Sequence, residues 1–486
     1  MNYQDIQNFI NGEFVSCANQ RINVDSPLNG EVISTVPLST FSDVDSAVIA
    51  AKNAFPGWSG MTSKMRSQIL YTYRQILEQN VDLLAAIIHD ENGKTMDEAI
   101  AEVRKSIELT EFACSIPQIA TGEVLEVSIG VECRTEYAPL GVVACINPFN
   151  FPHMVPHWTV PNAIALGNCI VMKPSELTPI SSVKMAEMLK QAGLPDGVFN
   201  VVNGAKEVVE AICDHPGIKA VSFVGSTPVA QIVYRRATAN LKRCLALGGA
   251  KNHLIVLPDA NLELSASDIA ASMCGSAGQR CMAASVMIAV GNVNPVIEKL
   301  CTEVSKFIPG AKMPPIISRK SRENLIAYIN DAEKKGAELL VDGRKFSNDE
   351  TASSTGYYLG PTIIDWRNSS SKMPDSEVFG PVFEIIAAKS VEEAISIQHE
   401  SPFGNAASAF TQNGAIAKMV AQQASAGMIG INIGVPVPRE PFSFGGWNSS
   451  KFGAGDITGK SSLGFWSQLK KVTSKWAKQE ITDWMS

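Results

Sequence analysis

The sequence has 486 residues, which at about 100–200 residues per domain predicts roughly two to four domains. Lys and Arg together number 41 and Asp and Glu 48, so the formal net charge is −7. The sequence lacks the long basic runs that bind nucleic acid or a membrane surface. Hydrophobic residues make up 45% and charged residues 18%, which is an ordinary globular composition. The sequence shows no targeting signal and no apolar stretch of about 18 residues, so we expect a soluble, cytoplasmic protein.

Two amphipathic helical regions are predicted near the start of the chain. Residues 43–55 carry Val44, Ala47, Val48 and Ala51 at helical spacing. Residues 65–90 carry a longer apolar stripe with a polar interruption at Gln79-Asn80. The interruption indicates that the second region is divided near that point.

From residue 141 to about residue 259, short apolar runs alternate with helical segments. The runs are apolar on both faces, as buried parallel strands are. They cover residues 141–146, 168–172, 198–202, 220–224 and 253–257. Helices are predicted at 181–191, ended by Gly193, and from 228 to about 237. This alternation predicts a doubly wound α/β sheet, a fold that often binds a nucleotide at the carboxyl ends of its strands.

A second alternation of helices and strands follows residue 259. Strands are expected near 286–290, 384–388 and 430–433, which indicates another α/β domain. Residues 464–476 alternate in part between apolar and polar side chains. That pattern favours an edge strand or a contact with a partner.

The ten cysteines are scattered, with neither a Cys-x-x-Cys pair nor histidines at finger-like spacing, so we expect no metal site. Without a secretion signal they are expected to be free thiols and mostly small buried side chains, as around Cys145 and Cys169. A disulfide between Cys274 and Cys281 is the less favoured alternative. For His153 and His157, packing or surface roles are favoured over ligand roles.

A glycine turn between a predicted strand and a predicted helix is the nearest approach to a nucleotide-binding motif. The usual Gly-x-Gly-x-x-Gly and Gly-x-x-x-x-Gly-Lys patterns do not occur, but residues 224–228 read Val-Gly-Ser-Thr-Pro. Backbone N–H groups and hydroxyls at a helix N-terminus can bind phosphate. From this segment alone, simple capping of the helix is the favoured alternative.

A thiol with a neighbouring cation stands in the segment 275–283. Arg280 precedes Cys281, and Gly275 and Gly278 make the preceding backbone adaptable. A cation beside a thiol can lower its pKa and favour the nucleophilic thiolate. From local composition, a buried cysteine beside a structural arginine is an equally good interpretation.

Five segments, taken in their order along the chain, decide between the alternatives for the glycine turn and for Cys281. They are Pro-Phe-Asn-Phe-Pro at 148–152, Lys-Pro-Ser-Glu at 173–176, Phe-Val-Gly-Ser-Thr at 223–227, Gly-Gln-Arg-Cys at 278–281 and Glu-Val-Phe-Gly-Pro-Val at 377–382. With them the chain resembles the aldehyde dehydrogenase superfamily along essentially its whole length. The resemblance implies a homodimer or homotetramer of α/β subunits, each with three parts. These are a Rossmann-type NAD-binding domain (1–120 and 140–248), an α/β catalytic domain (249–445) and a small β oligomerisation extension (121–139 and 446–486).

The same resemblance implies the roles of individual residues. Cys281 would be the nucleophile, and the Asn150 amide with the Cys281 backbone N–H would form the oxyanion hole. The residues expected to contact NAD are Phe149, Lys173, Glu176, Gly225, Ser226, Glu377 and Phe379. Among these, Lys173 and Glu176 would contact the adenosine ribose, Ser226 the pyrophosphate, and Glu377 with Phe379 the nicotinamide side. A carboxylate at Glu176 would accept a ribose hydroxyl and repel a 2′-phosphate, so NAD is expected in preference to NADP.

One missing acid points to a subfamily. Hydrolytic members carry a general-base Glu in Glu-Leu-Gly-Gly-Lys, whereas this chain has Leu247 at that position, so water attack on an acyl-enzyme should be slow. Coenzyme A is then the expected acyl acceptor. Residues 213–216, 249–253 and 441–444 add to a resemblance to CoA-acylating methylmalonate-semialdehyde dehydrogenases. That family converts malonate or methylmalonate semialdehyde to acetyl-CoA or propionyl-CoA with loss of CO2.

The substrate carboxylate would be bound by Arg280, because a guanidinium pairs with a carboxylate through two hydrogen bonds. A second arginine of the family corresponds here to Lys105, with Arg104 adjacent, and a lysine keeps the charge but loses the fork. The segment 307–316 is also shorter than the family pattern. The alternatives are a hydrolytic aldehyde dehydrogenase with another base and a non-catalytic binding protein on the same scaffold.

Overall fold

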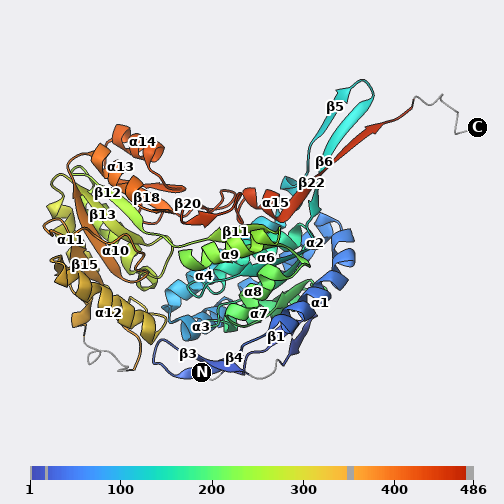
Figure 1. Ribbon diagram of the computed structural model, residues 1–486, viewed down its shortest axis with the longest axis horizontal. Coiled ribbons are helices and arrows are strands. Elements are labelled where there is room, and N and C mark those ends of the chain that lie inside the picture. The colour runs from blue at the N-terminus through green and yellow to red at the C-terminus, as the bar shows by residue number, and fades with distance from the viewer. Residues whose placement is uncertain (1–2, 17–19, 347–354, 478–486) are drawn as a thin grey trace, which may run out of the picture.

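The computed structural model describes residues 3–16, 20–346 and 355–477 (Figure 1). Two large sheets form the body, and a three-stranded sheet extends away from it. The first sheet has the order β2-β1-β9-β8-β7-β10-β11-β21, and the second has the order β14-β15-β16-β13-β12-β18-β19. The extension has the order β22-β6-β5. This arrangement confirms the expected α/β fold with a small β extension.

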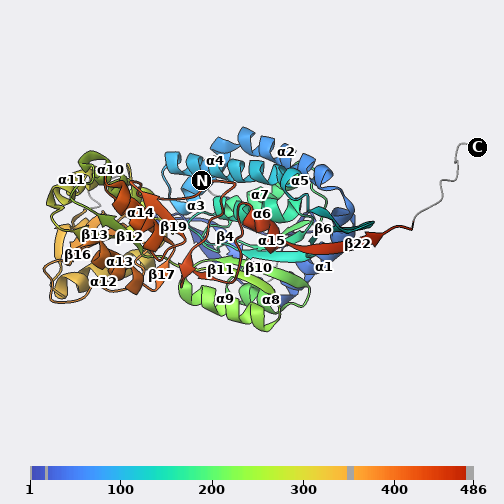
Figure 2. The ribbon, with the colours of Figure 1, turned by 90° about the horizontal axis from the view of Figure 1, so that it is seen from above.

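The first sheet has a parallel core with antiparallel strands at both edges. Its strands are β1 (Asn8–Ile10), β2 (Glu13–Val15), β7 (Val142–Ile146), β8 (Cys169–Lys173), β9 (Phe199–Val201), β10 (Ile218–Val224), β11 (Arg243–Leu247) and β21 (Lys451–Phe452). Every residue of β7 and β8 is buried. Helices cover both faces of the sheet, which explains why these strands are apolar on both sides (Figure 2).

The helices predicted from the sequence around this sheet are present in the structure. They are α1 (Phe41–Gly60), α2 (Ser63–Gln79), α3 (Val81–Asn92), α4 (Met96–Cys114), α5 (Ile116–Ile119), α6 (Met154–Ala165), α7 (Ile180–Gln191), α8 (Lys206–Asp214) and α9 (Thr227–Ala239). The predicted polar interruption is Asn80, which ends α2 and begins α3. A hairpin of β3 (Arg21–Asp25) and β4 (Val32–Pro37) lies beside this part of the chain.

The second sheet is parallel except at β14. Its strands are β12 (Asn252–Val256), β13 (Ala284–Val290), β14 (Glu338–Val341), β15 (Thr362–Asp365), β16 (Val382–Ala388), β18 (Ala406–Phe410) and β19 (Met428–Ile431). Its helices are α10 (Leu262–Cys274), α11 (Asn294–Val304), α12 (Arg319–Lys334), α13 (Val391–Glu400) and α14 (Gly414–Gln423).

The strand at 253–257 belongs to the second sheet, although its sequence pattern groups it with the strands of the first. It forms β12, between β13 and β18. Only residues 248–251 separate it from β11. A crossover that returns a strand to the same parallel sheet needs about 10–12 residues or more. The chain therefore leaves the first sheet at this point, next to the segment that contains Leu247.

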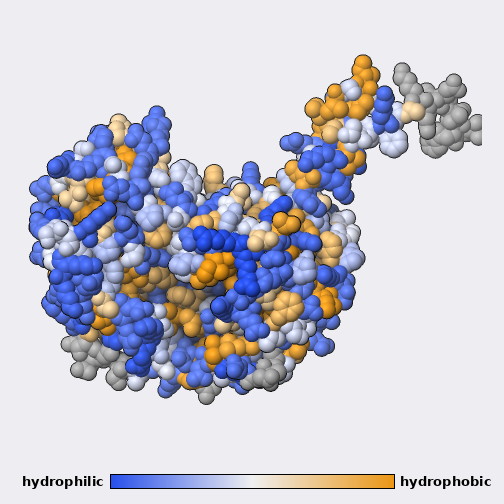
Figure 3. Space-filling model, in the orientation of Figure 1, coloured by the Kyte–Doolittle hydropathy of each residue, from blue (hydrophilic) through white to orange (hydrophobic). Residues whose placement is uncertain are grey.

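The extension is built from β5 (Val124–Ser128), β6 (Val131–Pro139) and β22 (Ser467–Lys475). β22 pairs antiparallel with β6 along its whole length. The predicted strand at 464–476 begins later than expected, because α15 (Ser461–Trp466) buries Phe465 and Trp466 in the core. The tip of the extension exposes apolar side chains, seen as orange in Figure 3, and Ile129 is 98% exposed.

Two short strands connect the end of the chain to the body. β20 (Trp447–Asn448) pairs with β17 (Phe403–Gly404), and β21 completes the edge of the first sheet. Within the described residues 446–477, β22 is the strand that joins the extension. None of the helices in the described ranges has the length and apolar character required to cross a membrane.

Candidate active site

Cys281 follows a tightly turned segment that comes directly after α10. Ser276 and Ala277 have left-handed backbone angles, with φ of 51° and 50°, which non-glycine residues rarely adopt. Gly278 also has a positive φ, and a Cβ there would lie 2.1 Å from the Gly380 carbonyl oxygen. Only glycine allows the Cys281 segment and the Gly380 loop to approach so closely. This explains the glycine of the Gly-Gln-Arg-Cys motif.

The Cys281 backbone is held by two asparagine side chains. The carbonyl oxygen of Cys281 accepts hydrogen bonds from the Asn252 amide at 2.9 Å and the Asn405 amide at 2.8 Å. Asn252 belongs to the segment 249–253 that carries part of the family resemblance, but Asn405 was missed, because no motif surrounds it. These bonds fix the backbone from which the thiol projects.

The pKa of the Cys281 thiol is raised to about 12, mainly by burial and also by the nearby Glu377 carboxylate, whereas the charge of Arg280 acts in the opposite direction. The lowering expected from Arg280 is therefore real but is outweighed by desolvation. In the cofactor-free protein the thiol is the favoured form at neutral pH.

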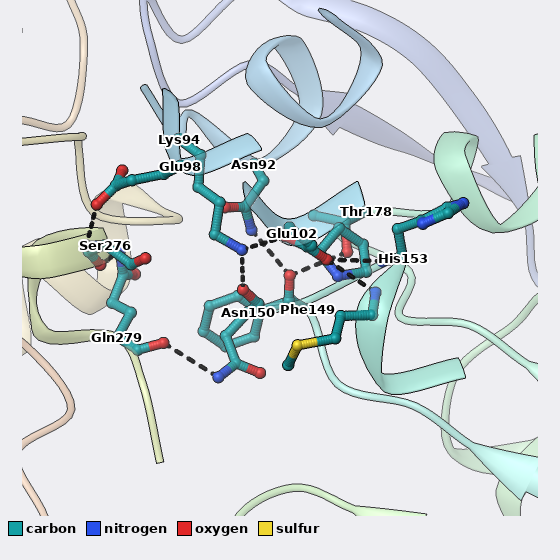
Figure 4. A network of polar contacts seen from close by, with 12 residues as sticks. Asn92, Lys94, Glu98, Glu102, Phe149, Asn150, His153, Thr178, Ser276 and Gln279 are labelled. Carbon is teal, nitrogen blue, oxygen red and sulfur yellow. Dashed lines mark hydrogen bonds and ion pairs between the residues drawn. The ribbon is translucent and has the colours of Figure 1, made fainter. Parts of the chain in front are cut away.

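Asn150 lies against the Cys281 segment. Its amide nitrogen donates a hydrogen bond to the Gln279 carbonyl oxygen at 3.0 Å (Figure 4). An amide nitrogen carries two hydrogens, so one remains available for a ligand oxygen. Gln279 is itself held by the chain at 315–317, because its side chain donates to the Pro315 carbonyl and accepts from the Ile317 N–H.

A buried charged network that the sequence analysis missed lies behind Asn150. The Lys94 ammonium donates to the Asn150 carbonyl oxygen at 2.6 Å and forms an ion pair with Glu102 (Figure 4). Glu98 accepts a hydrogen bond from the Ser276 N–H at 2.6 Å. The one available sequence signal is the Thr95-x-x-Glu98 capping box at the start of α4, which the structure contains.

The expected nicotinamide-side residues come together from different parts of the chain. The rings of Phe149 and Phe379 meet edge to face with centroids 5.9 Å apart. Glu377 accepts a hydrogen bond from the Ala250 N–H at 2.8 Å, and burial raises its pKa to about 7. Lys251 donates to the carbonyl oxygens of Pro374 and Ser376, so it holds the loop that carries Glu377.

The expected adenosine-side residues lie after β8 and before α9. The Lys173 ammonium is 2.6 Å from the Glu176 carboxylate. Burial alone would raise the pKa of Glu176, but the charge and hydrogen bond of Lys173 lower it. Ser226 occupies the N-cap position of α9, yet within the described chain its side chain makes no capping hydrogen bond. The hydroxyl and the first N–H groups of α9 therefore remain available for an anion.

These residues fit a dinucleotide. An ammonium–carboxylate pair suits ribose hydroxyls, an uncapped helix N-terminus beside Gly225 suits a pyrophosphate, and the Phe149–Phe379 pair suits a flat ring. The fit to a dinucleotide is judged from the hydrogen-bond donors, acceptors and aromatic rings of these described residues.

The three cations expected to bind a substrate carboxylate have different surroundings. Arg280 donates through Nη2 to the Ala271 and Ser272 carbonyls in the last turn of α10, and burial lowers its pKa. Among the described residues its buried Nε has no partner. Lys105 pairs with Glu440 at 2.7 Å, and Arg104 is exposed.

The remaining candidates are placed as follows. His153 and His157 are buried with ring centroids 4.5 Å apart, and they bond to Ser106 and Tyr73, so they pack the interior. Burial lowers the pKa of both. The nine cysteines that the structure describes are free, Cys274 included, while Cys17 lies outside the described residues. In the described ranges no three His, Cys, Asp or Glu side chains gather as metal ligands would.

Known proteins resemble the chain along its length. The model of the aldehyde dehydrogenase family matches residues 14–472. Malonate-semialdehyde dehydrogenase 2 of Bacillus thuringiensis (strain Al Hakam) is 43% identical over 484 residues, covering 98% of this chain and 99% of the relative. Malonate-semialdehyde dehydrogenase 1 of Geobacillus thermodenitrificans (strain NG80-2) is 41% identical over 482 residues, with coverage of 97% and 99%.

Solved structures agree with these relatives. The crystal structure of methylmalonate-semialdehyde dehydrogenase from Oceanimonas doudoroffii superposes with a TM-score of 0.95 at 39% identity, covering 98% of this chain and 99% of that one. A protein from Sinorhizobium meliloti 1021 complexed with NAD also gives a TM-score of 0.95, at 38% identity and 99% coverage of both chains. The chain therefore belongs to the aldehyde dehydrogenase family, whose members are oxidoreductases that act on aldehydes.

Proposed function

We propose that this enzyme uses NAD to oxidise malonate or methylmalonate semialdehyde, and that it transfers the acyl group to coenzyme A with loss of CO2. The observation that carries the proposal is the hydrogen bond of the Asn150 amide to the Gln279 carbonyl, two residues before Cys281. The bond supports the proposal because it holds the Asn150 amide, the expected oxyanion donor, against the segment that carries Cys281. The names of the full-length relatives support the substrate class.

The chemistry follows from the residues around Cys281. Its sulfur adds to the aldehyde carbon, and the charge that develops on the aldehyde oxygen is stabilised by the remaining Asn150 N–H and the Cys281 backbone N–H. Bound NAD supplies the hydride acceptor. Phe149, Phe379 and Glu377 would hold the reactive end of that cofactor beside Cys281, while Lys173, Glu176, Gly225 and Ser226 would hold its other half.

Transfer to coenzyme A follows from the position of Leu247. Leu247 is 3% exposed at the end of β11 and lies in the main hydrophobic core. It cannot activate a water molecule, so a Cys281 thioester would persist until a thiol attacks it. We therefore favour coenzyme A over water as the acyl acceptor.

The charge of Glu176 supports NAD over NADP. Its pKa is held below the usual range by Lys173, so the carboxylate stays ionised at neutral pH and would repel a 2′-phosphate.

The substrate carboxylate would be bound mainly by Arg280. Its Nε is buried without a partner among the described residues, so a carboxylate oxygen would satisfy it. Lys105 would contribute less, because Glu440 neutralises it, and the exposed Arg104 least.

One assay tests the function. NADH formation is measured with malonate semialdehyde and with propanal, each with and without coenzyme A, and the acyl product is identified by mass spectrometry. We expect acetyl-CoA and coenzyme A-dependent turnover with malonate semialdehyde, and none of it in Cys281→Ala. If the rate of NADH formation does not depend on coenzyme A and free acid is released, the hydrolytic alternative is established instead. Inertness with all aldehydes would leave a non-catalytic binding protein.

We also propose the domain division given by the family resemblance. Residues 1–120 and 140–248 would bind the cofactor, 249–445 would carry Cys281, and 121–139 with 446–486 would mediate a homodimer or homotetramer in the cytoplasm. The exposed apolar side chains of the extension support self-association: Val124 is 68% and Leu125 66% exposed. Sedimentation of the wild type and of a Leu125→Glu variant tests this, because a monomeric wild type would contradict it.

A further inference from the structure

Lys94 is buried beside the candidate oxyanion donor and takes no part in the chemistry described above. Its side chain is 1% exposed, and it lies in the turn between α3 and α4. Its ammonium donates to the Asn150 carbonyl, forms an ion pair with Glu102 and lies 3.8 Å from the centroid of the Phe151 ring. These three contacts use the whole ammonium group, which has three N–H donors.

The contacts of Lys94 enclose Asn150 from behind. The ammonium holds the backbone carbonyl of Asn150 and the ring of the next residue, while Asn92 donates to the carbonyl of Phe149 at 2.8 Å. The backbone on both sides of Asn150 is thereby fixed, and the direction of its side chain follows from that backbone. The amide then reaches the Gln279 carbonyl.

The start of α4, directly after this turn, also holds the nucleophile segment. Glu98, four residues after Lys94, accepts the Ser276 N–H through one carboxylate oxygen. Its other oxygen accepts from the Thr95 N–H and hydroxyl at the start of α4. Lys94 and Glu98 therefore connect Asn150 and the Cys281 segment to one short piece of backbone (Figure 4).

Glu102 closes the arrangement from the other side. One of its oxygens pairs with Lys94, and the other accepts the backbone N–H groups of His153 and Met154 at the start of α6. Its side chain is 0% exposed, so the pair is shielded from solvent and little screened. Lys94 thus holds both ends of the 150–154 segment. Its ammonium bonds directly to Asn150, and through Glu102 it is connected to the backbone N–H groups of His153 and Met154.

We propose that Lys94 is a positioning residue that sets the Asn150 amide in register with Cys281, and that the rate of the reaction depends on it. The proposal rests on the oxyanion role proposed for Asn150. It requires only aldehyde oxidation, so it can be tested with whichever aldehyde and acyl acceptor the wild type uses. Failure of the semialdehyde assignment would change that substrate and leave the test of Lys94 intact.

A double-mutant cycle tests the proposal on the full-length enzyme. Asn150→Ala should lower kcat by about 100- to 1,000-fold, as loss of an oxyanion donor does. Lys94→Met should lower kcat by about 100-fold, as misplacement of a catalytic group by about 1 Å does. The double variant should be no slower than Asn150→Ala, because Lys94 acts only through that residue. A role in folding alone would make the two losses multiply, and that result would overturn the proposal.

A matched control separates positioning from general stability. Lys242 is also buried, at 6% exposure, and its ammonium donates to the carbonyl oxygens of His215 and Ile218. Lys242→Met removes an equivalent buried cation outside the candidate site. We expect it to lower Tm without lowering kcat. A loss of kcat in Lys242→Met equal to that in Lys94→Met would overturn the proposal.

A second pair of variants covers a failure of Lys94→Met to fold. Removing one partner of a buried ion pair strongly destabilises a protein, because the other charge is left unpaired. Glu102→Gln and Lys94→Met/Glu102→Gln differ only in the Lys94 side chain, whose ammonium contacts Asn150 and the Phe151 ring, and the second variant leaves no buried charge unpaired. We expect the second variant to be about 100-fold slower than the first. Equal kcat values would overturn the proposal.

Discussion

The Lys105 ammonium lies 2.7 Å from the Glu440 carboxylate, with the two side chains only 19% and 13% exposed. Lys105 projects from α4, and Glu440 lies in the segment that follows β19, so the pair joins two distant parts of the chain. Glu108 is a second acid at 3.1 Å from the same ammonium. A lysine neutralised in this way attracts a substrate carboxylate less strongly than a free cation does.

Glu440→Gln should leave Lys105 with Glu108 as its acidic partner and make its charge more available to the substrate. A partly buried ion pair contributes about 1 kcal/mol, which corresponds to about a fivefold lower KM for malonate semialdehyde. The KM for propanal, which has no carboxylate, should stay unchanged. Steady-state kinetics with both aldehydes measure the effect. Equal changes in both KM values would show that Glu440 acts on the shape of the site and not on its charge.

The reactivity of Cys281 should depend on pH in the cofactor-free enzyme. Because the thiol pKa is about 12, alkylation by iodoacetamide should accelerate about tenfold per pH unit between about pH 7 and 10, without a plateau. Peptide mapping identifies the modified residue, and Cys281→Ser is the control. A plateau near pH 8 would mean that the thiol is far less desolvated than the structure indicates.

Glu377→Gln should increase the alkylation rate of Cys281. The carboxylate raises the thiol pKa by repulsion, and its own pKa is about 7. It is therefore ionised and repulsive above about pH 7, and protonated below that pH. The ratio of the alkylation rate of the variant to that of the wild type should therefore grow as pH rises from 6 to 8, because the repulsion that the variant lacks develops as Glu377 ionises. A constant ratio across that range would contradict the electrostatic coupling.

Glu176→Gln should relax the choice of cofactor. Removing the carboxylate removes its repulsion of a 2′-phosphate and leaves Lys173 without its 2.6 Å partner. The ratio of kcat/KM for NAD to that for NADP should fall by at least about tenfold, since an unfavourable like-charge contact costs several kcal/mol. Lys173→Met should weaken both cofactors instead. An unchanged ratio in Glu176→Gln would place the carboxylate away from the ribose.

Leu247→Glu should destabilise the protein and should not create a hydrolytic enzyme. The sequence alone suggests that this substitution restores the missing base, but Leu247 is 3% exposed within the core. Burying a carboxylate there costs several kcal/mol. We expect a lower Tm and no release of free acid without coenzyme A, whereas Leu247→Met should be tolerated. Wild-type Tm together with acid release would show that this side chain faces the acyl group.

Local sequence was sufficient for the elements whose formation depends on local pattern. The apolar runs at 141–146 and 168–172 predicted strands buried on both faces, and Gln79-Asn80 predicted the break between α2 and α3, as the structure confirms. The strand at 253–257 was predicted as a strand but grouped with the first sheet. Its sheet is decided by the short connection from β11, which periodicity does not report.

The sequence by itself determined the family, through motifs that carry Cys281, Asn150, Lys173 and Glu377. Only the tertiary structure showed what surrounds them. Lys94 and Asn150 are 56 positions apart, and Lys105 and Glu440 are 335 apart, so neither pair leaves a local pattern. The same holds for the thiol pKa. An adjacent arginine is visible in the sequence, whereas desolvation, the larger effect, arises only when distant segments close around the sulfur.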